Sequence, residues 1–149
     1  MLAAGQVIAA VAALIEGAPS MTGRVFTDRA WPFASAELPA WRVYADEEEV
    51  TPAGIAFPAR QMHELLVHCA GYVRAVSGID DALHALAAAA LTALFATQQT
   101  TRLAPLNCSV VLARIERGLE TDGESAIGRV VLALRVRFHT FNNAPETIT

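Results

Sequence analysis

Side chains that could act as nucleophiles, bases or metal ligands are few and widely spaced in this sequence. They are His63, His68, His84, His139, Cys69 and Cys108. His63 and His68 differ by an odd number of positions on one expected strand, so their side chains should point to opposite sheet faces and not share a metal ion. The sequence has no G-x-S-x-G, P-loop, G-x-G-x-x-G or H-E-x-x-H motif. We therefore expect no catalytic residue, no metal and no cofactor.

The two cysteines and the adjacent aspartates have structural interpretations. Cys69 and Cys108 both lie in apolar runs, which favours two free thiols in the core over a single buried disulfide. Asp80 and Asp81 precede an apolar helical pattern, where acidic groups stabilise the positive end of a helix. We expect Asp80 or Ser77 to cap that helix, and we do not interpret the aspartates as a catalytic pair.

The segment "TDRAWPFASAELPAWRVY", residues 27–44, contains both tryptophans of the chain beside an Asp-Arg pair. No histidine, cysteine or serine lies close enough in sequence to act with Asp28 in catalysis. Tryptophan and arginine in a proline-stiffened loop are typical of docking surfaces. We expect Asp28, Arg29 and Trp31 to contact another protein, with Trp41 anchoring the loop in the core. The alternative is that Trp31 folds back onto the sheet as a lid.

Charge and hydropathy exclude two classes of partner. The 149 residues carry a net charge of −4, and all eleven basic residues are arginine, so bulk binding of nucleic acid is not expected. The apolar N-terminal stretch, residues 1–17, lacks a positively charged start and is too short to span a bilayer. We therefore expect neither a nucleic-acid partner nor a membrane partner.

Hydrophobic periodicity predicts one domain over residues 1–149 and the order of its elements. The expected elements are a helix over 1–16, strands with long loops over 24–74, a helix over 78–97 and a hairpin over 107–141. This order predicts an α+β fold, in which a mostly antiparallel sheet carries both helices on one face. The opposite face should be polar and rich in arginine, and the last residues, 142–149, should form a loose arm.

The hairpin is expected to turn at Asp122-Gly123, because this dipeptide favours a two-residue type I′ turn. That turn pairs Ile115 with Val130 on the core face, and Glu116 with Arg129 on the other face. By the same register, Ala113 lies opposite Leu132 and Val111 opposite Leu134. The residues expected to face the core on the second strand are Val130, Leu132, Leu134, Val136 and Phe138.

Two further groups of charged residues are candidate protein interfaces. Glu47, Glu48 and Glu49 begin a proline-bearing connection over 47–59, which we expect to be mobile in the free protein and ordered against a neighbour. Arg129, Arg135, Arg137 and His139 should form an outward row on the last strand. Such a row could bind phosphate, but a solvated face with weak Arg–Glu pairs is favoured. Of this row, Arg135, Arg137 and His139 are the interface candidates.

Several stretches together resemble the tail terminator proteins of long-tailed bacteriophages and prophages. These stretches are "GRVFTDRAWPFASAELPAWRVYADEE", "RQMHELLVHCAGYVR", "DDALHALAAAALTAL" and "LETDGESAIGRVVLALRVRFHTF". The resemblance covers nearly the whole chain and rests on diffuse, non-catalytic motifs. Trp41 stands where a small aliphatic residue is more usual, and the second helix is unusually rich in alanine.

The resemblance implies a structural protein of the virion tail, assembled in the host cytoplasm, with no enzymatic activity and no cofactor. Its implied partners are further copies of itself in a ring, typically hexameric, the tail tube protein and a head-completion or connector protein. The ring would end tube polymerisation. Two alternatives stay open: a head-tail connector or neck protein, and a small α+β enzyme or ligand-binding protein with a pocket under Trp31 and Trp41.

Overall fold

A computed structural model describes residues 1–27, 33–75, 77–96, 106–122 and 125–149 of the chain. In these ranges the elements follow in the order α1 (Ala3–Glu16), β1 (Val25–Phe26), a 3-10 turn (Ser35–Glu37), β2 (Ala40–Pro52), β3 (Arg60–Ala75), α2 (Ile79–Leu94), β4 (Ser109–Asp122) and β5 (Ser125–Phe141). The predicted helices and strands are therefore present, with ends that differ by a few residues.

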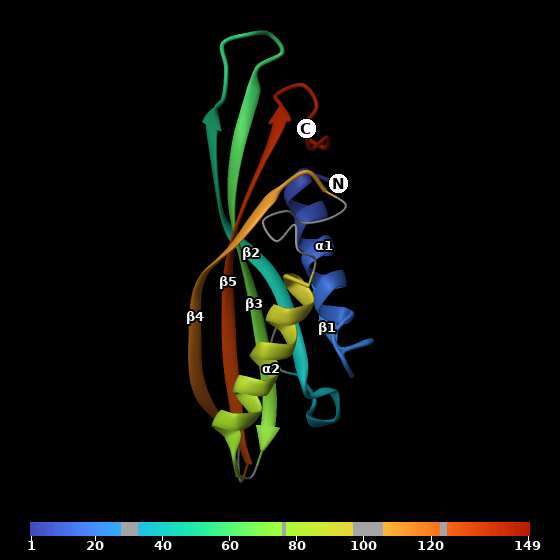
Figure 1. Cartoon of the computed structure of the whole chain (residues 1–149), viewed down its shortest axis with the longest axis vertical. Coiled ribbons are helices and arrows are strands. Elements are labelled where there is room, and N and C mark those ends of the chain that lie inside the picture. The colour runs from blue at the N-terminus through green and yellow to red at the C-terminus, as the bar shows by residue number, and fades with distance from the viewer. Residues whose placement is uncertain (28–32, 76, 97–105, 123–124) are drawn as a thin grey trace.

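The strands form one five-stranded sheet in the order β1-β2-β3-β5-β4. All neighbours are antiparallel except β1 and β2, which are parallel over two residue pairs. Both helices lie on the same face of this long, twisted sheet (Figure 1). α1 contacts β1 and β2, and α2 contacts β3 and β5. The predicted α+β fold, with two helices on one face of a mostly antiparallel sheet, is confirmed.

The main core lies between the helices and the sheet. Val7, Val11 and Ile15 recur at helical spacing on α1 and are completely buried. On β5 the alternate residues Val130, Leu132, Leu134, Val136 and Phe138 are buried at 1% exposure or less, as predicted. Burial of one whole face of β5 fixes which side chains point away from the helices.

The start of α2 differs from the prediction. Its N-cap residue is Gly78, at a φ of +67°, and no side chain bonds to the free amide groups there. The predicted capping by Asp80 or Ser77 was therefore wrong. The chain enters the helix through Gly78 in a left-handed conformation, which glycine adopts without strain. Asp80 and Asp81 lie in the first turn, where their charges complement the helix dipole.

The opposite sheet face is only partly polar, which corrects the expectation. Near the start of β2 it carries a second apolar cluster, in which Phe33 packs over Ala70, Tyr72 and Val131. Phe33 contacts the Tyr72 ring at a centroid distance of 5.5 Å. Phe33 thus covers one end of this face, where Arg42 and Arg129 also lie, and a second group of charged residues occupies the other end.

The register of the β4–β5 hairpin also differs from the prediction. Asp122 pairs with Ser125, so Ile115 lies opposite Leu132 and Glu116 opposite Val131. The expected pairs of Ile115 with Val130 and of Glu116 with Arg129 were wrong by two residues, and a bulge between Leu112 and Arg114 moves Val111 opposite Arg135. A shift of two keeps each side chain on its face, so the alternation along β5 could not distinguish the two registers. Gly123 and Glu124 lie outside the described residues.

Two segments expected to be irregular are built into the fold. The acidic run Glu47–Glu49 belongs to β2, which continues to Pro52, so only 53–59 connect β2 to β3. The tail, 142–149, packs back on the domain: the Thr149 amide donates to the His139 carbonyl, and the Ala3 amide to the Pro145 carbonyl. Both segments were expected to be irregular because their sequences are polar, but polar residues can still form backbone hydrogen bonds with neighbouring segments.

None of the described helices is long and apolar enough to cross a membrane.

Candidate functional site

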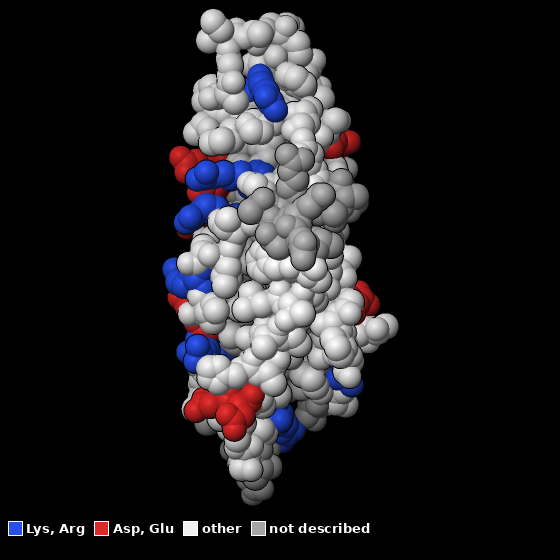
Figure 2. Space-filling model, viewed as in Figure 1, with Lys and Arg blue, Asp and Glu red and all other residues white. Residues whose placement is uncertain are grey.

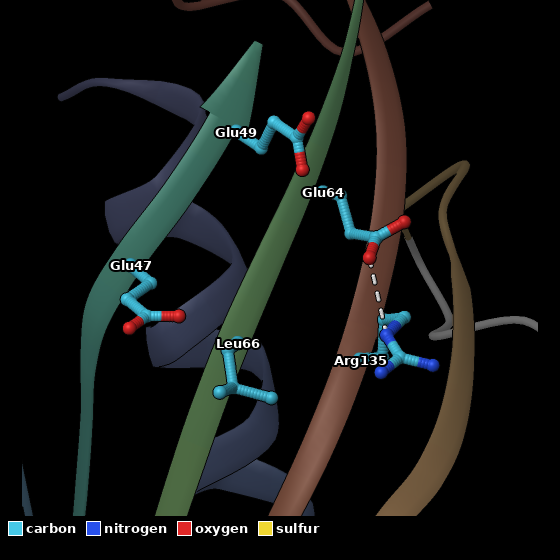
Figure 3. Close-up of a pocket in the computed structure, with 5 residues that line it drawn as sticks. All are labelled: Glu47, Glu49, Glu64, Leu66 and Arg135. Atoms are coloured by element: carbon cyan, nitrogen blue, oxygen red, sulfur yellow. Dashed lines mark ion pairs between the residues drawn. The ribbon is translucent and has the colours of Figure 1, made fainter.

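A charged surface occupies the sheet face away from the helices, at the end of the sheet near the β2–β3 connection. Glu47 and Glu49 project from β2, Glu64 and Leu66 from β3, and Arg135 from β5, around a shallow hollow (Figure 3). They share this face because alternate residues of paired strands point the same way. We call these five residues, together with Arg137, the charged face.

Glu64 holds the two arginines of this face in place. Its Oε1 atom lies 3.1 Å from Arg135 Nε, and its Oε2 atom lies 2.7 Å from Arg137 Nε. These groups are partly solvent-exposed, so each pair adds little to stability. Their main effect is to orient two guanidinium groups beside one carboxylate, and this confirms Arg–Glu pairing on the β5 row, with other partners than expected.

Glu47 and Glu49 carry the negative charge that remains on this face. Both are exposed, and among the described residues neither forms an ion pair. The charge of this face therefore changes across the sheet, from unpaired carboxylates on β2 to arginines on β5. Such a surface suits recognition of a partner with the complementary charge pattern.

Glu48 lies on the helix-bearing side and has a structural role. His63 Nδ1 lies 2.8 Å from Glu48 Oε1, and His63 Nε2 lies 2.8 Å from the Thr140 hydroxyl oxygen. The His63 ring also stacks on Phe138, with centroids 4.8 Å apart and planes 6° from parallel. The structure thus separates Glu48 from Glu47 and Glu49, which the sequence had grouped.

His139 and Arg137 line a second hollow near the end of β5, beside Arg60 and Cys108. Partial burial lowers the pKa of His139, and the nearby charges of Arg60 and then His63 lower it further. The neutral imidazole is favoured because desolvation and positive neighbours both oppose a second positive charge. This cluster could accept an anionic group, but Arg137 is already paired with Glu64.

Two exposed apolar features were missed by the sequence analysis as candidate contacts. Ile55 and Phe57, in the β2–β3 connection, are 107% and 88% exposed. Leu112, Ile115 and Leu119 on β4 are 38%, 40% and 62% exposed. The apolar residues within the Pro/Gly-rich stretch "TPAGIAFPA" were the available signal for the first feature. The second depends on which strands the helices cover, and this is not visible in the sequence.

Asp28, Arg29 and Trp31, the first predicted interface group, lie outside the described residues. Trp41, expected to anchor their loop, is buried at 1% exposure in the main core.

No group of three or more His, Cys, Asp or Glu side chains in the described ranges could hold a metal ion. Cys69 and Cys108 are free, buried thiols, and burial raises the pKa of Cys69 to about 12. A thiol held neutral in this way is a poor nucleophile.

Comparison with known proteins finds a shared fold. No protein-family model matches the sequence, and a search of curated proteins finds no match. Among solved structures, a chain of the "Virion of native gene transfer agent (GTA) particle" is similar, with a TM-score of 0.58 at 19% sequence identity. The alignment covers 93% of this chain and 98% of that chain. At this identity the likeness establishes the fold, and the arrangement extends over essentially both chains.

Proposed function

We propose that this protein is a structural component of a phage-like virion, and specifically a tail terminator. In this role several copies form a ring, typically a hexamer, on the last ring of the tail tube. The ring ends tube polymerisation and offers its other side to a head-completion or connector protein. The protein acts by binding and carries out no catalysis. It would be found in the virion tail after assembly in the host cytoplasm.

The observation that carries this proposal is the fold likeness to a chain of a gene transfer agent particle. It extends over 93% of this chain and 98% of that one, so the two chains share this fold over nearly their full lengths. The resemblance of the sequence to tail terminators points in the same direction from independent features. A fold alone does not fix a function, so the surface must also suit assembly.

The surface suits assembly in two ways. Ile55 and Phe57 are almost fully exposed beyond the ends of β2 and β3, and neighbouring exposed apolar side chains of this kind suit a contact with another protein. Glu47 and Glu49 present unpaired carboxylates on the adjacent sheet face. We propose that these groups, with Asp28, Arg29, Trp31, Arg135, Arg137 and His139, form contacts to neighbouring proteins in the tail.

A head-tail connector or neck protein is the second candidate function. It would use the same kind of ring and the same exposed groups, but its partner would be the head portal instead of the tube end. An enzyme or small-ligand binder is less favoured, because the hollows around Glu64 and His139 are shallow and polar and lack an apolar enclosure for a ligand.

A tube-growth experiment tests the function. Tail tube protein from the same virus or prophage is polymerised with and without this protein, and tube lengths are measured by electron microscopy. We expect shorter tubes of uniform length, with a ring at one end. Unchanged lengths and bare ends at saturating protein would contradict the terminator role, and binding to the portal instead would favour the connector.

A matched variant locates the contact. Ile55→Ser with Phe57→Ser removes the exposed apolar groups while leaving the core intact. We expect this double variant to keep its melting temperature and lose tube capping. Full capping by the variant would exclude these side chains from the tube contact.

A further inference from the structure

The two long edges of the sheet differ in charge, and among the described residues neither is paired along its length with a further strand. β4 forms one edge over Ser109–Asp122, and no described strand pairs with its outer side. At the other edge, β1 pairs with β2 at Trp41 and Arg42, and in the described part of the chain β2 beyond Arg42 has no outer strand partner. Open edges of this length bind other strands unless something blocks them.

The β2 edge is acidic beyond Arg42, whereas the β4 edge carries both arginines and carboxylates, with Arg114 and Glu116 on the charged face. The β2 edge carries Glu47 and Glu49 on the charged face and Glu48 on the helix-bearing side, as their partners Leu66, Glu64 and Leu65 show. The β4 edge carries one arginine on each face. Arg114 lies opposite Ala133, on the charged face, and Arg117 lies opposite Val130, on the helix-bearing side. In the view of Figure 2, charged side chains gather along the margin where β4 lies, and the helix layer is mainly uncharged.

The existing partners of these charges leave room for new ones. Arg117 Nη1 lies 3.4 Å from His84 Nε2, and within the described ranges no carboxylate forms an ion pair with Arg117. Arg114 Nε lies 3.0 Å from Glu116 Oε1 on the exposed surface, where ion pairs exchange easily. The carboxylates of Glu47 and Glu49 have no ion-pair partner among the described residues.

The helix layer is incomplete over β4. Leu112, Ile115 and Leu119 lie opposite Leu134, Leu132 and Gly128, which places them on the helix-bearing side. They remain exposed because α1 packs on β1 and β2, and α2 packs on β3 and β5. If β2 of a second copy continued the sheet past β4, the α1 helix of that copy, which packs on its β2, would lie on this same side. It would then lie next to the three exposed residues Leu112, Ile115 and Leu119.

We infer that β4 of one copy pairs with β2 of the next copy, so that copies join edge to edge into a continuous sheet. This inference rests on the proposed ring and identifies its subunit contact. The strand directions agree with it: β4 is antiparallel to β5, and β5 runs parallel to β2 because both are antiparallel to β3. Repeating the subunit side by side therefore brings β4 and the next β2 together antiparallel, the more stable pairing.

The pairing joins unlike surfaces, so it propagates from copy to copy and closes into a ring if the rotation per subunit allows. Arg114 would meet Glu47 or Glu49 on the charged face. The competing arrangement is a two-fold dimer of β4 with β4. That dimer can place Arg114 of one copy opposite Glu116 of the other, but it uses only the β4 edge and leaves the β2 edge, with the carboxylates of Glu47 and Glu49, without a partner.

Charge exchange tests this pairing. One variant carries Arg114→Glu, and the other carries Glu47→Arg and Glu49→Arg; all three side chains are exposed, and melting curves verify that each variant folds. Sedimentation velocity of the wild type and of each variant measures association. We expect each variant alone to associate on the order of tenfold or more weakly than the wild type. Mixed in equal amounts they should assemble again, because every new contact then joins opposite charges.

The outcomes separate this inference from the proposed function. Assembly of the Glu47→Arg/Glu49→Arg variant alone, at wild-type strength, would show that β2 is not the partner and favour the β4–β4 dimer. Wild-type rings whose association neither variant weakens would overturn the edge pairing and leave the terminator role intact. Rings that behave as expected but leave tube length unchanged would overturn only the terminator role. A wild type that stays monomeric, alone and with tail tubes, would overturn both.

Discussion

The indole of Trp41 fills the space above Gly71 on the neighbouring strand. The two residues are direct partners in the β2–β3 ladder, and a Cβ atom added at Gly71 would lie 2.9 Å from two carbons of the Trp41 ring. The same atom would lie 3.0 Å from a methyl carbon of Leu86 on α2. Trp41 can therefore be buried at 1% exposure only because its partner on β3 has no side chain.

Gly71→Ala is expected to destabilise the protein by about 1–3 kcal/mol, because overpacking forces the indole or α2 to move. Chemical denaturation followed by tryptophan fluorescence measures the change. Gly118→Ala is the matched control, since a Cβ atom at Gly118 on β4 has open space around it, and we expect a change within about 0.5 kcal/mol. Equal effects at the two positions would contradict the packing described for Trp41.

Leu132→Ala is expected to cost about 2–5 kcal/mol of unfolding free energy, because Leu132 is completely buried at the centre of β5. Leu119→Ala removes the same atoms from a side chain that is 62% exposed on the adjacent strand, and should change stability by about 0.5 kcal/mol or less. Urea unfolding of both variants checks this. A small loss for Leu132→Ala would mean that the helix layer does not cover β5.

Stability should fall as the pH rises above about 9 because of Cys69. Burial raises the pKa of this thiol from 9.0 to about 12, so between these values the unfolded chain releases a proton that the native protein keeps. The unfolding free energy therefore decreases with pH in this window. Cys69→Ala should be less stable at neutral pH but show a flatter decline between pH 9 and pH 11. Parallel profiles for the two proteins would exclude this titration as a cause.

Stability should also fall as the pH drops through the ordinary titration range of histidine. The pKa of His139 is lowered by burial and by the charges of Arg60 and His63, so the unfolded chain takes up a proton before the native protein does. Binding of more protons by the unfolded state makes stability increase with pH in this range. His139→Gln should flatten the profile between about pH 5 and pH 7, and thermal melts across this range measure it. An unchanged slope in His139→Gln would exclude this titration as a cause.

The candidate surface was predictable only in part. Arg135 and Arg137 were assigned outward positions correctly, because the burial of every second residue on β5 fixes the side of the others. Glu47, Glu48 and Glu49 could not be divided between two faces while they were interpreted as a loop. Their division follows from backbone pairing with β3, and this contact between distant segments leaves no local pattern in an acidic run. The exposure of Ile55 and Phe57 likewise depends on how far the chain packs around them.

The sequence by itself determined the α+β class, the two helices, the strand order along the chain and the inward row from Val130 to Phe138. These features follow from hydrophobic spacing, which acts within a single element. Only the tertiary structure decided the hairpin register, the extent of β2, the burial of Phe33 on the second face and the exposure of the apolar residues Leu112, Ile115 and Leu119 on β4. Each of these depends on which distant surfaces meet, and a shift of two residues or an uncovered edge strand keeps the same local alternation of apolar and polar side chains.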